Sequence, residues 1–127
     1  MSALILDAGA FIAVEQNDRE TVLRLRRAQQ AGLDLRSNGA VVAQVWRHPD
    51  GRQARLARLL KSVDVRAVDD GVGREAGVLL GRAGTRDAID GSVVVIAASG
   101  DRILTSNPDD ITRLVAASGR PVLVVRC

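Results

Sequence analysis

The chain has 127 residues, of which 46% are hydrophobic, and it carries a formal net charge of +3 at pH 7. This length and apolar content predict one globular domain spanning residues 1–127 and argue against a disordered chain. Phe11 and Trp46 are the only aromatic residues, which disfavours RNA-binding modules that stack bases on aromatic platforms.

Cys127 is the only cysteine, so the chain has no internal disulfide and a reducing compartment is expected. No N-terminal signal peptide is recognisable, and no apolar run approaches the ~20 residues that a membrane span needs. We therefore expect a protein of the cytoplasm with no membrane association. Lys61 is the only lysine. The arginine-based positive charge fits phosphate contact, but a composition bias of the source genome would produce it equally well.

In the first half of the chain, the pattern alternates between strand and helix. Asp18 is a good N-cap and Gly32 a natural helix end, and the His-Pro-Asp-Gly segment at 48–51 interrupts a helix. The expected elements are, in order, a strand at 3–6, a short helix or turn at 8–14, a helix at 18–31, a strand at 33–37, and helices at 40–46 and 52–61.

The second half continues in the same way. Asp69 and Asp70 cap a helix, and Pro108 suits the first position of another, with Asn107 as its N-cap. The expected elements are a strand at 63–68, a helix to about residue 83, a loop at 84–86, a helix at 87–98, a strand at 103–105, a helix at 108–117 and a strand at 121–125. Apolar strands that alternate with helices predict an α/β fold with a parallel sheet.

Acidic and amide side chains lie in four segments, each at a strand end or on a helix that follows a strand. They are Asp7, Gln44, Asp90, and Asn107 with Asp109. Ligands of parallel sheets bind outside the carboxyl ends of the strands, and carboxylates there are usual oxygen ligands for Mg²⁺ or Mn²⁺. Clustered carboxylates repel one another and normally persist only with a cation, which can activate water for phosphodiester cleavage.

Several residues in and beside these segments also have a purely structural interpretation. Asp7 could cap the turn that follows its strand, and Asp87 is more readily explained as a helix N-cap. Asp90 could be a solvent-facing acid, although its neighbours are apolar. Asp109 could simply favour the positive end of a helix dipole. Thr105 and Ser106 could bind a metal-linked water or only turn the backbone.

Arginine residues offer candidate phosphate contacts. Arg82 and Arg86 flank the loop that leads to Asp87, so they are expected near the proposed site. Further arginines around the central helices could form a solvated face instead: Arg47, Arg52, Arg55 and Arg58.

The sequence lacks the residues and motifs that several other kinds of site require. His48 is the only histidine and no usable cysteine accompanies it, so a structural zinc site is not available. No nucleophile-elbow motif supports a serine–histidine triad, and a surface role suits His48 better. No glycine-rich phosphate-binding motif is present.

Three segments, in this order and spacing, resemble the PIN-domain ribonucleases, and among them the VapC-type toxins of bacterial toxin–antitoxin pairs. They are LILDAGAFIA, GTRDAIDGSVVVIAA and ILTSNPDDITRLV. The resemblance covers essentially the whole chain. It implies a three-layer α/β/α sandwich with a central parallel sheet, and Mg²⁺- or Mn²⁺-dependent cleavage of RNA.

The resemblance also implies roles for individual residues. Asp7 matches the first acid of the family and Asp90 the third, while Gln44 and Asn107 stand where the second and fourth acids are expected. Asp109 matches an auxiliary acid, which makes Asp7, Asp90 and Asp109 the expected metal ligands. Gln44 and Asn107 would orient water or phosphate. Gly9 replaces a small polar residue of the family. The expected partners are RNA, a small antitoxin whose arginine can enter the acid pocket, and a second copy of the chain in a homodimer.

Two amides in place of acids leave two main hypotheses open. The first is a toxin-like endoribonuclease with weakened activity, and the second is a non-catalytic PIN-like module that binds RNA or an antitoxin. A generic α/β scaffold without a site is a third, weaker reading.

Overall fold

The computed structural model describes residues 2–48 and 50–127. A five-stranded sheet forms its centre, and each strand runs parallel to its neighbours. The strands are β1 (Ala3–Leu6), β2 (Asp34–Asn38), β3 (Val63–Arg66), β4 (Arg102–Thr105) and β5 (Leu123–Arg126). The helices are α1 (Ala8–Glu15), α2 (Arg19–Gln30), α3 (Gly39–Val45), α4 (Ala54–Leu60), α5 (Asp70–Ala83), α6 (Ala88–Val95) and α7 (Pro108–Ser118).

The strands follow the order β3-β2-β1-β4-β5. The chain therefore builds outward from β1 in one direction, and then returns to the other side of β1 with β4. In open parallel sheets, the carboxyl ends of the strands at such a reversal point form the usual ligand-binding crevice. Here those ends are Leu6, followed by Asp7, and Thr105.

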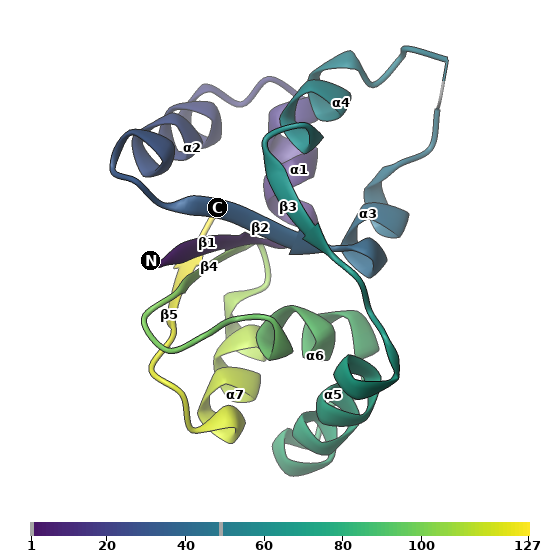
Figure 1. The fold of residues 1–127 in the computed structure, drawn as a ribbon, viewed down its shortest axis with the longest axis vertical. Coiled ribbons are helices and arrows are strands. Elements are labelled where there is room, and N and C mark those ends of the chain that lie inside the picture. The colour runs from purple at the N-terminus through teal and green to yellow at the C-terminus, as the bar shows by residue number, and fades with distance from the viewer. Residues whose placement is uncertain (1, 49) are drawn as a thin grey trace.

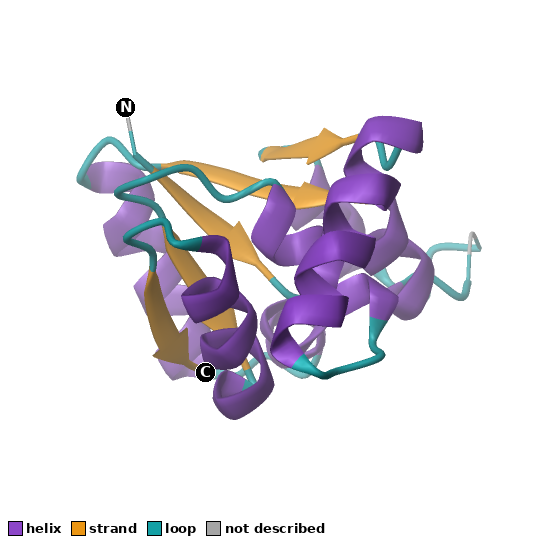
Figure 2. Cartoon of the chain, turned by 90° about the horizontal axis from the view of Figure 1, so that it is seen from below, coloured by secondary structure: helices purple, strands orange, loops and turns teal. Residues whose placement is uncertain are grey.

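Helices cover both faces of the sheet, as the three-layer prediction requires. Helices α1, α2 and α4 lie on one face, and α5, α6 and α7 on the other (Figure 1). Figure 2, seen from the second face, shows the last three helices lying across the strands. Because helices cover both faces, the central strands are buried on both sides, which explains why their residues are apolar.

The core is aliphatic, as the scarcity of aromatic residues predicted. Every residue of β1 is buried, and Ile103 and Leu104 of β4 are fully buried beside it. Phe11 is fully buried on α1, whereas Trp46 is half-buried after α3. Val93 and Val94 of α6 are also fully buried, so this helix is enclosed on most sides, as its apolar stretch indicated.

Several element boundaries differ from prediction, and β3 ends at Arg66 rather than at residue 68. Segment 8–14, predicted as helix or turn, is helical and extends to Glu15. Helix α6 ends at Val95 rather than at residue 98. At this end of the helix, Arg120 donates hydrogen bonds to the carbonyls of Val94 (3.1 Å) and Val95 (3.4 Å). The last strand begins at Leu123 rather than at residue 121, because Pro121 has no N–H to donate to a neighbouring strand.

Across residues 2–48 and 50–127, no helix combines the length and apolar character that crossing a membrane requires.

Candidate functional site

Asp7 lies at the reversal point of the sheet, between the ends of β1 and β4. It caps α1 by accepting a hydrogen bond from the Ala8 N–H at Oδ1 (2.8 Å). Its Oδ2 accepts a second bond from the hydroxyl of Thr105 (2.7 Å). The capping role and the site role are therefore compatible, because each carboxylate oxygen keeps a further acceptor position. The side chain is fixed in direction and only 6% exposed.

Asp90 reaches the same region from α6. It is 7% exposed, and its N–H donates to Oδ1 of Asp87, the N-cap of that helix (3.1 Å). The structure thus assigns Asp87 to capping, as the sequence favoured. Burial raises the pKa of Asp90 to about 7, helped by the nearby carboxylates of Asp87, Asp7 and Asp110 and opposed by a hydrogen bond from Asn107.

Asn107 joins two carboxylates. Its Nδ2 donates to Oδ2 of Asp90 (3.4 Å) and to Oδ2 of Asp110 (3.0 Å). Its backbone N–H donates to the Thr105 hydroxyl oxygen (3.0 Å), which connects it to Asp7 through one side chain. Asn107 precedes α7 but makes no side-chain cap bond with that helix, so its amide is directed to the acids instead.

The structure brings Asp110 rather than Asp109 into this group. Asp110 is half-buried, contacts Asn107 and raises the pKa of Asp90. Asp109 is an exposed side chain in the first turn of α7, as its structural interpretation predicted. Within residues 2–48 and 50–127, no three His, Cys, Asp or Glu side chains are grouped closely enough to hold a metal ion together. The predicted trio of Asp7, Asp90 and Asp109 is therefore not assembled in this conformation.

Gln44 lies on α3 with an exposed side chain, and the hydrogen bonds of the described residues include none from its amide. Near α3, hydrogen bonds instead hold the side chain of Asn38, which is fully buried at the end of β2. Its Nδ2 donates to the Ser92 hydroxyl on α6 (3.0 Å), and its Oδ1 accepts from the Val41 N–H (3.0 Å). Asn38 thereby ties α3 to the helix that carries Asp90, a contact that separated sequence segments could not reveal.

Gly9 and Ser106 fit tightly against each other beside Asp7. A Cβ atom added to Gly9 would lie 2.5 Å from the Ser106 Oγ and 2.7 Å from its Cβ. The missing side chain at position 9 is therefore what lets the loop after β4 approach α1. This contact gives Ser106 a packing role that the sequence left undecided.

Arg82 and Arg86 are both exposed, on the last turn of α5 and in the loop before Asp87. They lie on the segment that leads into α6, as predicted, and stay free to meet a ligand from solvent.

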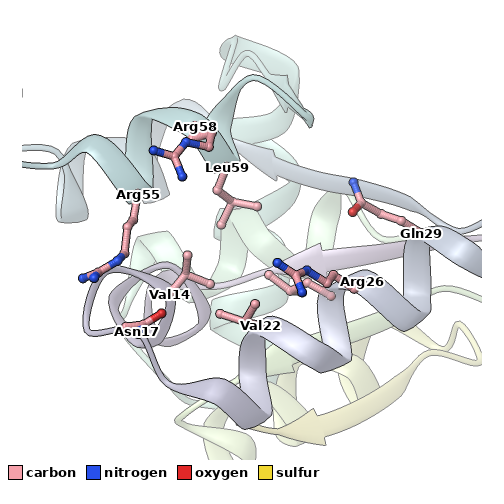
Figure 3. Close-up of a pocket in the computed structure, with 9 residues that line it drawn as sticks. Val14, Asn17, Val22, Arg26, Gln29, Arg55, Arg58 and Leu59 are labelled. Atoms are coloured by element: carbon pink, nitrogen blue, oxygen red, sulfur yellow. The ribbon is translucent and has the colours of Figure 1, made fainter.

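A groove of about 330 Å³ lies between α1, α2 and α4, away from the acids. Its apolar lining comes from Val14, Val22, Leu25 and Leu59. Arg26 enters from α2 and Arg55 and Arg58 from α4 (Figure 3). Among the described residues none of these three guanidinium groups is within ion-pair distance of a carboxylate, so the groove combines an apolar lining with unneutralised positive charge.

No protein-family model matches this sequence, and no curated protein matches it either. Solved structures do match. The chain is similar to one in the structure of VapBC2 from Rickettsia felis bound to a DNA fragment from their promoter, with a TM-score of 0.72, 12% identity and 98% of each chain covered. It is also similar to one in the structure of FitAB bound to the IR36 DNA fragment, with a TM-score of 0.62, 14% identity, and coverage of 97% of this chain and 94% of that one. At this identity the likeness establishes the fold alone, and it agrees with the predicted three-layer α/β/α sandwich with a central parallel sheet.

Proposed function

We propose that this chain is a metal-dependent endoribonuclease, the toxin of a bacterial toxin–antitoxin pair acting in the cytoplasm, with activity weakened by Gln44 and Asn107. The observation that carries the proposal is the convergence of Asp7 and Asp90 at the sheet reversal. Two elements far apart in the chain deliver buried carboxylates to one place, and one of these has a strongly raised pKa. Such perturbed groups mark functional sites.

The donor set suits one Mg²⁺ or Mn²⁺ ion. Asp7 and Asp90 supply hard oxygen ligands, and their mutual repulsion is the property that a divalent cation relieves. A bound cation of this kind would supply an activated water and would neutralise charge on the cleaved phosphodiester. With two carboxylates directed to the same place, one ion is better supported than two.

The remaining residues position these groups and the substrate. Thr105 and the Ala8 N–H hold Asp7 in one orientation, and Asn107 holds Asp90. We assign phosphate contact to Arg82 and Arg86, because both are exposed on the segment that presents Asp90. Asp109 could add charge at the site margin after a side-chain or backbone adjustment.

The test is metal-dependent cleavage of a mixed RNA pool by the purified protein, with EDTA and Asp90→Asn as controls. We expect cleavage that needs Mg²⁺ or Mn²⁺ and falls by at least about a hundredfold in the variant, since removal of a metal ligand removes the main electrostatic stabilisation. Cleavage of equal rate in the variant would point to a contaminating nuclease and would contradict the proposal.

A non-catalytic RNA- or antitoxin-binding module is the second candidate. It is favoured by the amide of Asn107, which donates a hydrogen bond to Asp90, and by the exposed side chain of Gln44. This candidate predicts an inert parent that still binds RNA. Cleavage gained in the combined variant Gln44→Glu, Asn107→Asp would then identify a decayed nuclease site.

We further propose that the groove between α1, α2 and α4 contacts the antitoxin. The unneutralised Arg26, Arg55 and Arg58 favour a partner segment with acidic side chains, and the apolar lining favours aliphatic ones. The reversal Arg55→Glu, Arg58→Glu should weaken binding of the co-expressed antitoxin. The matched reversal Arg82→Glu, Arg86→Glu, outside the groove, should not.

A homodimer is the proposed oligomeric state. Val65, Val68 and Val78 are large apolar residues of the β3–α5 region and are between 42% and 52% exposed, which suits a protein contact. Light scattering of the purified chain would give a dimer mass, and Val78→Asp should shift it toward the monomer.

A further inference from the structure

A second groove lies between α2 and the strands β1, β4 and β5, apart from the groove between α1, α2 and α4. Its volume is about 440 Å³. Leu4 and Ala28 line it and are only 4% and 8% exposed, so they form the floor of a deep depression rather than part of a flat surface. Arg27 of α2 and Arg102 of β4 stand on its two sides, and we call it the α2–β4 groove.

The helix layer on this face leaves part of the sheet uncovered. The register pairs Leu4 with Arg102, and Arg102 with Leu123 of β5, so the three side chains point to the same face. A strand covered by helices on both faces is apolar, but here Arg102 is exposed and Leu123 is 59% exposed. The groove is therefore bordered by a bare strip of sheet rather than by another packed helix.

Positive charge lines both sides of the groove. Arg24 is already engaged, because it lies 3.6 Å from the Glu20 carboxylate and donates to the Arg126 carbonyl (3.2 Å). Arg27 and Arg102 are exposed, and within residues 2–48 and 50–127 neither guanidinium has an ion-pair partner or a hydrogen-bond acceptor. Two planar guanidinium groups with free N–H donors suit an oxyanion.

The rest of the lining limits the kind of ligand. Apart from the arginines and Glu20, the described lining residues are all aliphatic: Leu4, Ala28, Ala31, Leu33 and Val125. A nucleotide base would find no aromatic ring among them to stack on, and sugar hydroxyls would find no neutral hydrogen-bonding side chain. The volume lies within the roughly 300–1,000 Å³ of small-molecule sites, whereas a stable protein contact covers about 800 Å² on each partner.

We propose that the α2–β4 groove binds a small aliphatic carboxylate. Arg27 and Arg102 hold the carboxylate group, and the hydrocarbon chain covers Leu4 and Val125. The site is separate from the acids, because Arg102 is the first residue of β4 and the acids lie beyond the other ends of the strands. The inference goes beyond the proposed nuclease and antitoxin contacts, and it holds whether or not the chain cuts RNA.

The experiment is an NMR titration of the ¹⁵N-labelled chain with octanoate. Acetate, which lacks the hydrocarbon chain, and 1-octanol, which lacks the charge, are the matched ligands. Octanoate should bind at least about tenfold more tightly than either, because buried methylene groups and ion pairing both contribute, and it should shift the amide signals of Leu4, Ala28 and Val125. Equal affinity for octanoate and 1-octanol would mean that the arginines take no part, and would overturn the proposal.

Two double variants locate the site. Arg27→Gln, Arg102→Gln should lower octanoate affinity by about tenfold and leave 1-octanol affinity unchanged, since it removes only the charge-assisted contacts. Arg55→Gln, Arg58→Gln removes the same charge from the groove between α1, α2 and α4 and should change neither. The reverse ranking would place octanoate in that other groove and would refute the assignment.

Ala31→Leu tests the apolar part without altering any charge. Ala31 is exposed at the end of α2 and lines the groove, so a larger side chain there narrows the groove and leaves the core intact. Octanoate should bind several-fold more weakly and acetate as before. Unchanged octanoate affinity would show that the hydrocarbon chain lies elsewhere and would count against the proposal.

Two other occupants would also overturn it. A short peptide of alternating leucine and glutamate that binds this groove more tightly than octanoate would assign the groove to a protein partner. If light scattering gives a dimer for the parent and a monomer for Leu123→Ser, a second copy of the chain covers this strip of sheet. Neither measurement depends on RNA cleavage, so the failure of this inference and the failure of the proposed function remain distinguishable.

Discussion

Asp90 shows how burial can move the titration of one residue into the physiological range. An unfolded aspartate titrates near pH ~3.9, whereas burial and neighbouring carboxylates raise the pKa of Asp90 in the folded chain to about 7. Below the unfolded pKa, Asp90 is protonated in both the folded and the unfolded chain, so its titration does not change the free energy of unfolding. As the pH rises from the unfolded pKa through the folded pKa, the unfolded chain releases this proton before the folded chain does, so stability is lost over that range and the loss levels off above it.

The prediction is a pH-dependent loss of stability that Asp90→Asn removes. Between about pH 5 and about pH 8, the free energy of unfolding in EDTA should fall by roughly 2 kcal/mol through Asp90 alone. Urea denaturation of parent and variant at both pH values measures this difference. An equal pH slope in the two proteins would mean that Asp90 titrates normally.

Gly9 tests how closely the loop after β4 packs against α1. Gly9→Ala should displace the loop after β4, because its Cβ would lie within 2.7 Å of both Ser106 side-chain atoms. We expect a loss of stability of about 1–3 kcal/mol, as for other overpacked positions. Ser106→Gly should recover part of that loss in the double variant, as measured by urea denaturation. Additive losses would show that the two residues do not compete for space.

At the scale of elements, Gln53 holds the connection between α3 and α4. It is 4% exposed, and its Oε1 accepts from the N–H groups of Arg47 (2.8 Å) and His48 (2.9 Å). Its Nε2 donates to the Val45 carbonyl (2.8 Å) and to Glu15 on α1 (2.9 Å). One side chain therefore satisfies backbone groups that a helix-to-helix loop would leave unpaired.

Gln53→Ala should destabilise the chain by about 1–3 kcal/mol, since buried donors and an acceptor lose their partners. Hydrogen exchange should show the loss locally, at the amides of Arg47 and His48. Gln53→Glu is the matched control, because it keeps the acceptors but loses the donors, and should leave these two amides more protected than in Gln53→Ala.

Elements with local signals were predictable, and contacts between elements were not. Asp18 and Asp69 cap their helices as their spacing indicated, and Asp7 and Asp90 stood out because apolar residues surround them. The choice of Asp110 over Asp109 depends instead on how α7 is rotated against α6. The bond from Asn38 to Ser92 likewise joins segments 54 residues apart, which no local pattern encodes.

At the scale of the whole molecule, the candidate site and a buried aspartate that stabilises the fold lie at opposite ends of the parallel strands. The candidate site lies at the carboxyl edge. At the opposite edge Asp101, 3% exposed, accepts hydrogen bonds from the Ala3 N–H at the start of β1 and from the Ala98 N–H after α6, each at 2.8 Å. Arg36 of β2 lies 3.9 Å from the same carboxylate. The charge is therefore buried with partners from three separate segments.

Asp101→Ala should consequently lower the free energy of unfolding by about 2–4 kcal/mol, because it leaves two buried N–H groups without their acceptor and removes a carboxylate that lies beside Arg36. Asp101→Asn retains one acceptor oxygen and should lose less. Under conditions where all three proteins remain folded, Mn²⁺ affinity should stay within about twofold, since distant sites behave additively. Urea denaturation and Mn²⁺ titration on the same samples give both quantities. A fall in metal affinity that parallels the fall in stability would show that the two edges are coupled through the sheet.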